Sequence, residues 1–224
     1  ALVREQGIKD IGLFYQDDAF GMAGRSGGQK ALSAYNLKFA VETSYKRNTT
    51  EVDAAIKAIL EKKPKAVMLF ALYPANAAFI KKCLANGYNP IFFGSSPTAL
   101  PAFAKEMAGQ KLSLMATSHL PFVSSDRDSP LVQAFIADMK SAGYTNFHQY
   151  GFEAYVNAGI LAEAIRLAGR NLNRETLRAS LERVNDFKIG ELSMGFSPEN
   201  HQATKLTYYV KWQDSNFTSA GRSK

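Results

Sequence analysis

Short apolar runs alternate with helix-like patterns over the first half of the chain. The runs predict strands over residues 11–15, 37–41, 66–72, 91–93 and 112–117. Apolar residues at helical spacing predict helices over residues 21–35, 75–85 and 99–108, and a further helix that starts at the capping-box-like segment 50–53 and ends before Pro64. Strands that alternate with helices and are joined by short turns predict an α/β fold, with a parallel sheet covered by helices on both faces.

The second half of the chain has a different pattern. Helices predicted over residues 130–142, 152–168 and 174–184 follow one another without a clear strand between them. Their apolar faces need a sheet to pack on, and this region does not supply one. Strand-like alternation returns at residues 192–196 and 206–212, on either side of a turn at 197–201. The polar tail that ends with Arg222 and Lys224 is expected to fray.

The formal net charge of +7 raises the question of a nucleic-acid partner. The densest basic stretch contains Lys57, Lys62, Lys63 and Lys65, but Glu61 interrupts it and it has no interleaved aromatic residues. This composition favours the solvated end of a helix over a phosphate-binding patch, so no nucleic-acid partner is predicted. No apolar run approaches the roughly 20 residues that a membrane span requires.

The residues that could carry chemistry do not form a catalytic or metal-binding arrangement. The glycine-rich run at 20–28 matches neither the dinucleotide fingerprint nor the P-loop, and it is read as small residues that let a helix pack closely. Asp17 and Asp18 sit where helix capping explains them, and Cys83 is read as a core thiol. Loop or capping roles are predicted for the widely spaced histidines, His119, His148 and His201. The sequence therefore predicts no catalytic residue, no metal site and no cofactor.

Aromatic and hydroxyl residues gather where three of the predicted strands end. Phe20 follows the strand at 11–15, Tyr73 follows the strand at 66–72, and Ser95 and Ser96 follow the strand at 91–93. Ligands of open parallel sheets bind at the carboxyl ends of the strands, so these residues are candidates for one ligand-binding crevice. For Phe20 and Tyr73, the pattern supports ligand contact and ordinary packing at the edge of the core equally.

Five segments, in order along nearly the whole chain, resemble the periplasmic solute-binding proteins of branched-chain amino acid type ABC transporters. These segments are 15–21 (YQDDAFG), 48–52 (NTTEV), 63–67 (KPKAV), 129–132 (SPLV) and 195–202 (GFSPENHQ). The resemblance implies a type I periplasmic binding fold, in which a ligand is held between two α/β lobes that close about a hinge.

The resemblance also implies a division of the chain. Residues 1–118 and 188–224 would form lobe two, and residues 120–186 would form the helical part of lobe one. The first lobe would then be incomplete, and the N-terminal portion of the parent protein, with its signal peptide, is expected to be absent. Helix faces left bare in this way are expected to associate with another chain or to remain poorly ordered.

The family's ligand-binding residues carry over at three places. Phe20 stands where an aromatic residue packs on the ligand, without the hydroxyl of a tyrosine, and Tyr73 matches a tyrosine at the end of a strand. Ser96 stands where amino-acid-binding members have a carboxylate that grips the ligand ammonium. Because a buried ammonium without a carboxylate partner is costly, a neutral or anionic solute such as a small carboxylate fits better than an amino acid.

Three classes of function remain open. The first is a periplasmic or membrane-anchored extracellular solute-binding protein, whose partners are a small-molecule solute and the membrane subunits of an ABC transporter. The alternative is a ligand-sensing ectodomain or a regulatory domain of the same fold. An enzyme is the third and least supported class.

Overall fold

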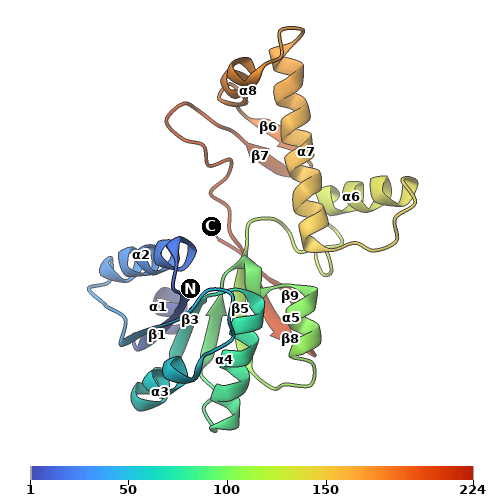
Figure 1. Cartoon of the computed structure of the whole chain (residues 1–224). Coiled ribbons are helices and arrows are strands. Elements are labelled where there is room, and N and C mark those ends of the chain that lie inside the picture. The colour runs from blue at the N-terminus through green and yellow to red at the C-terminus, as the bar shows by residue number, and fades with distance from the viewer. Residues whose placement is uncertain (1, 224) are drawn as a thin grey trace. The chain divides into compact units, whose positions relative to one another are not determined.

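The computed structural model describes residues 2–223 and contains two compact units (Figure 1). Among the described residues, the first unit comprises residues 2–118 and Tyr209–Gly221, and the second comprises His119–Tyr208 and residues 222–223. Each unit has its own hydrophobic core.

A seven-stranded sheet of order β2-β1-β3-β4-β5-β8-β9 forms the centre of the first unit. Its strands are β1 (Ile11–Gln16), β2 (Val41–Tyr45), β3 (Ala66–Phe70), β4 (Ile91–Gly94), β5 (Ser113–Ser118), β8 (Tyr208–Gln213) and β9 (Asn216–Arg222). The pairs β1–β2, β1–β3, β3–β4 and β4–β5 are parallel, as the alternating sequence pattern predicts. The chain therefore has the predicted α/β architecture.

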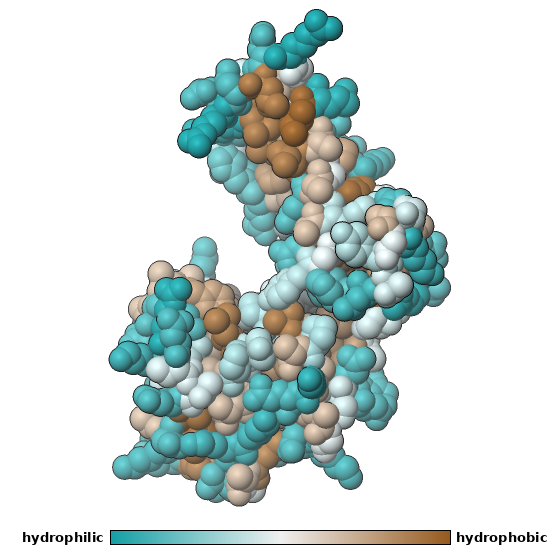
Figure 2. All heavy atoms as spheres, turned by 45° about the vertical axis from the view of Figure 1, so that its right-hand side comes forward, coloured by the Kyte–Doolittle hydropathy of each residue, from teal (hydrophilic) through white to brown (hydrophobic). Residues whose placement is uncertain are grey.

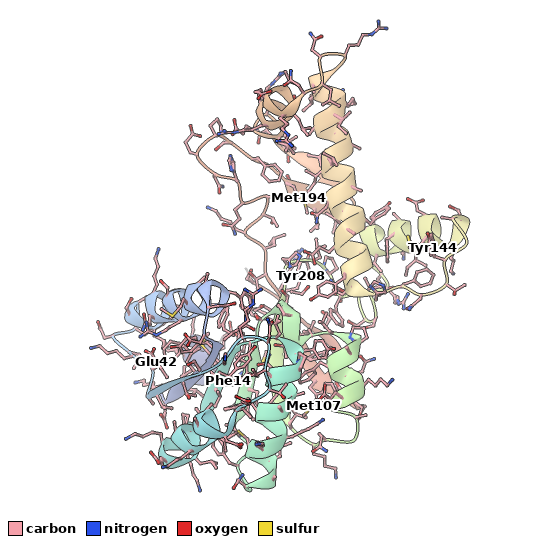
Figure 3. The ribbon with its side chains drawn as sticks, viewed as in Figure 1. Phe14, Glu42, Met107, Tyr144, Met194 and Tyr208 are labelled. Carbon is pink, nitrogen blue, oxygen red and sulfur yellow. The ribbon has the colours of Figure 1, made fainter. Side chains whose placement is uncertain are left out.

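Helices pack on both faces of this sheet. They are α1 (Leu2–Gln6), α2 (Ala19–Ser33), α3 (Asp53–Lys62), α4 (Tyr73–Ala85), the 3-10 turn η1 (Ser96–Thr98) and α5 (Pro101–Glu106). Successive side chains of a strand point to opposite faces, so β1 is buried on both sides. Ile11 packs with Leu2 of α1 and Leu32 of α2. Phe14, labelled in Figure 3, stacks on Phe79 of α4 with ring centroids 4.2 Å apart.

The position of β2 and the N-terminal cap of α3 differ from the sequence prediction. The strand predicted at 37–41 lies at 41–45, because Leu37 and Phe39 pack against the core beside α1 and α2 as loop residues. The more polar β2 is tolerated because it is an edge strand that is partly solvated. The capping box predicted at Thr50 is also wrong, since Val52 is the N-cap of α3 and makes no side-chain cap bond.

The tail predicted to fray is a strand as far as Arg222, and Lys224 lies outside the described residues. Asp214 and Ser215 both have positive φ, at 50° and 62°, which is the geometry of a two-residue hairpin loop. The ring of Phe217 in β9 is buried 5.4 Å from that of Trp212 in β8. Aromatic packing therefore offsets the entropy cost that would otherwise leave a polar terminus disordered.

The second unit contains three helices and a small antiparallel sheet. Its elements are α6 (Pro130–Ser141), α7 (Gln149–Ala168), α8 (Arg174–Leu181), β6 (Phe187–Ile189) and β7 (Leu192–Met194). Leu192 and Met194, two residues apart on one face of β7, share a core with Phe135 of α6 and Phe152 and Val156 of α7. The sequence pattern missed β6 because it is only three residues long.

The boundary predicted at residue 188 therefore differs from the structural division, which keeps residues 188–208 with the helices. The reason is the apolar face of β7, which packs in the core of the second unit. The predicted self-association finds no support, because β7 covers the faces of α6 and α7 that carry this core.

Figure 2 shows that hydrophobic surface nonetheless remains on this unit. Leu161 and Ile165 of α7 are 44% and 40% exposed.

Candidate functional site

The turn between β1 and α2 is held by Asp18, the N-cap of α2. Its Oδ1 atom accepts hydrogen bonds from the backbone N–H groups of Phe20 and Gly21, at 3.0 and 3.2 Å. Burial would raise the pKa of the Asp18 carboxyl, but these bonds, a bond from Gln16 and the charge of Arg47 together lower it. The capping role predicted for Asp17 and Asp18 is confirmed for Asp18, which fixes Phe20 in the first turn of the helix with 38% of its surface exposed.

The glycine-rich run allows α2 to lie close to the sheet. A Cβ at Gly21 would sit 1.8 Å from the backbone oxygen of Gln16, and one at Gly28 would sit 2.6 Å from the Phe39 ring. This confirms close packing as the role of these glycines. The close approach at Gly21 also brings the residue before it, Phe20, to the end of β1.

The turn between β3 and α4 carries Tyr73 at the first position of the helix. The helix begins two residues earlier than predicted. Proline is tolerated in the first turn of a helix, because a backbone N–H at that position would have no partner within the helix, so Pro74 does not prevent the earlier start. Tyr73 is partly exposed, and Leu72 beside it is 46% exposed. The aromatic side chain therefore lies at the surface where β3 ends.

The turn after β4 carries Ser95 and Ser96, both partly exposed. The Oγ atom of Ser95 is buried and has no hydrogen-bond partner among the described residues. Asn76 of α4, which is fully buried, donates to the backbone oxygen of Ala71 at 2.8 Å and to Oγ1 of Thr98 at 3.0 Å. Asn76 thus ties the β3–α4 turn to η1, a role that a polar residue within the otherwise apolar stretch 74–80 could have indicated.

The predicted candidates all follow the carboxyl ends of neighbouring strands. In the register of the sheet, Tyr15 lies opposite Phe70 and Leu69 lies opposite Gly94. The segments carrying Phe20, Tyr73 and the two serines therefore emerge from one edge of the sheet. This edge is where ligands bind in open α/β folds.

A cleft of about 410 Å³ lies at the same edge. It is lined by Gln16, Tyr45, Asn48, Thr49, Thr50, Leu72, Pro74 and Ala75. Tyr45 and Gln16 are each only 4% exposed, and the Tyr45 hydroxyl donates to Oε1 of Gln16 at 2.6 Å. The sequence pattern indicates neither residue, because it places the second strand at 37–41, and Gln16 follows an apolar run as any polar residue at a strand end does.

The other candidate residues have structural roles. Cys83 is fully buried, and burial raises the pKa of its thiol to about 12, so it is a core thiol as predicted. His148 is the N-cap of α7, and its Nδ1 atom accepts from the N–H of Gly151 at 3.1 Å.

Among the described residues, no group of three or more His, Cys, Asp or Glu side chains could hold a metal ion. None of the helices described is long and apolar enough to cross a membrane.

Several solved structures resemble this chain over nearly its whole length. A "possible leucine/isoleucine/valine-binding protein" from Rhodopirellula baltica is 25% identical, with a TM-score of 0.89 over 98% of this chain and 61% of its own. A substrate-binding periplasmic protein from Ralstonia solanacearum is 23% identical, with a TM-score of 0.83 over 97% of this chain and 63% of its own. A branched-chain amino acid ABC transporter protein from Rhodospirillum rubrum is 21% identical, with a TM-score of 0.74 over 96% of this chain and 61% of its own.

The chain thus spans about three fifths of the length of these solved structures. No curated protein sequence matches it. A family model described as periplasmic binding protein matches residues 1–218, which is nearly the whole chain. The architecture of the first unit and the resemblance of the sequence motifs agree with this match, and the family is one of binding proteins with the type I periplasmic fold and not a family of enzymes. The chain therefore belongs to the periplasmic binding protein family.

Proposed function

We propose that this chain is the solute-binding component of an ABC importer and binds a small organic solute without changing it. One observation carries the proposal: three neighbouring strands of a binding-protein fold end, at one edge of the sheet, in partly exposed aromatic and hydroxyl residues. Such edges bind ligands in open α/β sheets. The family match and the names of the similar structures support a small-molecule ligand.

The proposed binding residues are Phe20, Tyr73, Ser95 and Ser96. The exposed Phe20 ring offers an apolar face, and Tyr73 offers a ring together with a hydroxyl. Ser95 supports the assignment because its Oγ atom has no hydrogen-bond partner among the described residues, and a solute that reached this atom would supply one. No group in this set needs to act as an acid, a base or a nucleophile.

The proposed solute is uncharged or anionic, with a small carboxylate favoured over an amino acid. Ser96 is neutral and stands where the family resemblance implies a carboxylate for an ammonium group. A serine hydroxyl donates a hydrogen bond to a carboxylate, and it cannot neutralise a desolvated ammonium.

We also propose that the protein works outside the cytoplasmic membrane, in the periplasm or anchored at the cell surface, and delivers its solute to the membrane subunits of the transporter. The family match and the names of similar structures support this setting. A solute-free and a solute-bound form that differ in shape would let the membrane subunits distinguish loaded from empty protein.

A thermal-shift screen of the full-length natural protein tests the proposal. The panel contains leucine, isoleucine and valine, small aliphatic and aromatic carboxylates, and their amides. A solute that binds only the native state stabilises it by RT ln(1 + [L]/Kd), which is about 2.7 kcal/mol at a hundredfold excess over Kd.

We expect a carboxylate to raise the melting temperature, and mass spectrometry to recover that solute unchanged after long incubation. Conversion of the solute would support an enzyme instead. A panel in which no member at millimolar concentration shifts the melting temperature would contradict solute binding.

A further inference from the structure

The hydroxyl of Tyr45 connects two turns that carry proposed binding residues. It donates to Oε1 of Gln16 at 2.6 Å, at the end of β1. It also accepts from the backbone N–H of Leu72 at 3.5 Å, in the turn that precedes Tyr73. Tyr45 itself is the last residue of β2, a strand that contributes no proposed binding residue.

The connection continues from Gln16 to the other turn. Nε2 of Gln16 donates to Oδ2 of Asp18 at 2.7 Å, while Oδ1 of Asp18 accepts from the backbone N–H groups of Phe20 and Gly21. The side-chain amide of Gln16 is oriented by this pair of bonds, because its oxygen must face the tyrosine donor and its nitrogen the carboxylate. One chain of hydrogen bonds therefore runs from Leu72 through Tyr45, Gln16 and Asp18 to Phe20.

The centre of this hydrogen-bond chain, at Tyr45 and Gln16, is shielded from water and packed against aromatic rings. Tyr45 and Gln16 are each 4% exposed, and hydrogen bonds in such surroundings strengthen one another. The Tyr45 ring stacks on Phe14, with centroids 5.2 Å apart, and Phe14 stacks on Phe79 of α4. Burial raises the pKa of Tyr45, so its hydroxyl is a donor throughout the neutral range.

We infer that Tyr45, acting through Gln16, is a positioning residue of the solute site: it holds the β1–α2 turn and the β3–α4 turn in a fixed relation, and so sets the spacing of Phe20 and Tyr73. The inference rests on the proposed function. Without the hydroxyl, the β1–α2 turn keeps the Asp18 cap of its helix, but the hydrogen bonds that join the two turns through Tyr45 are lost. A solute would then have to order both turns as it binds, which lowers affinity.

The matched variants are Tyr45→Phe and Tyr88→Phe. The Tyr88 hydroxyl also bonds inside the protein, to the backbone oxygen of Pro64, but that contact lies where β3 begins and not where it ends. Both substitutions remove one partly or fully buried hydroxyl and keep the ring. The two variants are expected to lose comparable melting temperature. A difference between them in the exchange rates of the turns, or in Kd for a solute, would therefore arise from where the lost hydroxyl lies and not from lower stability.

Hydrogen–deuterium exchange of the full-length natural protein provides the first measurement. We expect Tyr45→Phe to speed exchange at least tenfold in peptides covering residues 17–22 and 71–76, and Tyr88→Phe to leave both peptides unchanged. Should Tyr45→Phe fail to fold, Gln16→Met interrupts the same chain with similar side-chain volume. Unchanged exchange in both peptides would overturn the inference.

Titration calorimetry with leucine and with phenylacetate as probes provides the second measurement. For a probe that binds the native protein, we expect Tyr45→Phe to raise Kd at least fivefold and Tyr88→Phe to leave Kd within twofold. Faster exchange in the turns with an unchanged Kd would also overturn the positioning role. If neither probe binds the native protein, phenylacetate is ruled out as the solute, and the exchange experiment still decides whether Tyr45 ties the two turns.

Discussion

A Cβ atom at Gly24 of α2 would lie 2.0 Å from Cδ1 of the Phe70 ring at the end of β3. At this contact, α2 packs against β3, the strand next to β1 in the sheet. The helix can reach that distance only because residue 24 has no side chain. The contact also limits how far α2, which carries Phe20 in its first turn, lies from β3, the strand that leads to Tyr73.

Gly24→Ala should therefore destabilise the protein, although alanine is the better helix former. We expect a loss of about 2 kcal/mol in the free energy of unfolding, because the added methyl must displace a large ring in the core. Urea denaturation measures the loss. The control is Gly27→Ala, since a Cβ at Gly27 meets nothing within 4 Å and should stabilise the helix by about 0.5 kcal/mol. Equal effects of the two substitutions would disprove the close packing.

Asp18→Ala should destabilise the protein in a pH-dependent way. Removing an N-cap costs about 1 kcal/mol at neutral pH. The pKa of Asp18 is lowered in the folded protein, so its charged form contributes stability above the ordinary carboxyl pKa, and this contribution is lost as the pH falls through the folded value. Unfolding curves at pH 7 and at about pH 2.5 should therefore show the difference from the native protein shrink in acid.

The control for this cap is its neighbour, Asp17, whose side chain is exposed. Asp17→Ala should change stability by less than about 0.5 kcal/mol at either pH. A difference for Asp18→Ala that stays constant from neutral to acidic pH would contradict the stabilising role of its charge.

Tyr73→Ala should weaken solute binding far more than folding. Loss of a central aromatic anchor typically costs about 2 kcal/mol, which is roughly a thirtyfold rise in Kd. Calorimetry of the full-length natural protein with the solute found in the screen measures the change. Leu69→Ala is the reverse control, because Leu69 is fully buried in β3 and its loss should reduce stability by about 3 kcal/mol. Native affinity in Tyr73→Ala would remove Tyr73 from the site.

Ser96→Glu tests the proposed charge preference. A carboxylate at position 96 should weaken an anionic solute by repulsion, and it would supply the partner that the ammonium of leucine needs. Ser96→Gln, of the same length but neutral, separates charge from size. Calorimetry with phenylacetate and with leucine should show affinity shifting from the first toward the second in the Glu variant only. Equal affinities in both variants would show that residue 96 does not contact the solute.

The sequence predicted those features that depend on residues near one another in the chain. The cap at Asp18, the close-packing glycines of α2 and the core position of Cys83 were all predictable, because a local pattern and a simple physical rule decide each one. The same holds for the alternation that predicted the parallel sheet. At the site, the local rule identified the strand ends that carry Phe20 and Tyr73.

Features that depend on distant contacts were missed or misplaced. Strand β2 is polar, although it pairs with β1 in the sheet. The apolar residues just before it, Leu37 and Phe39, pack against the core from a loop, and the periodicity of the sequence does not reveal this. β7 could not be assigned to the second unit from the sequence, because its buried partners in α6 and α7 precede it by 32 residues or more. Tyr45 and Gln16 are 29 residues apart, so nothing in the local pattern joins them.

The most direct test of solute binding at the carboxyl edge of the sheet is a crystal structure of the full-length natural protein, grown with the solute found in the screen. We predict that the solute lies against the Phe20 ring, within hydrogen-bonding distance of the Tyr73 hydroxyl and of Ser95 or Ser96. A solute bound at any other surface, with these four residues facing only solvent or protein, would contradict the account.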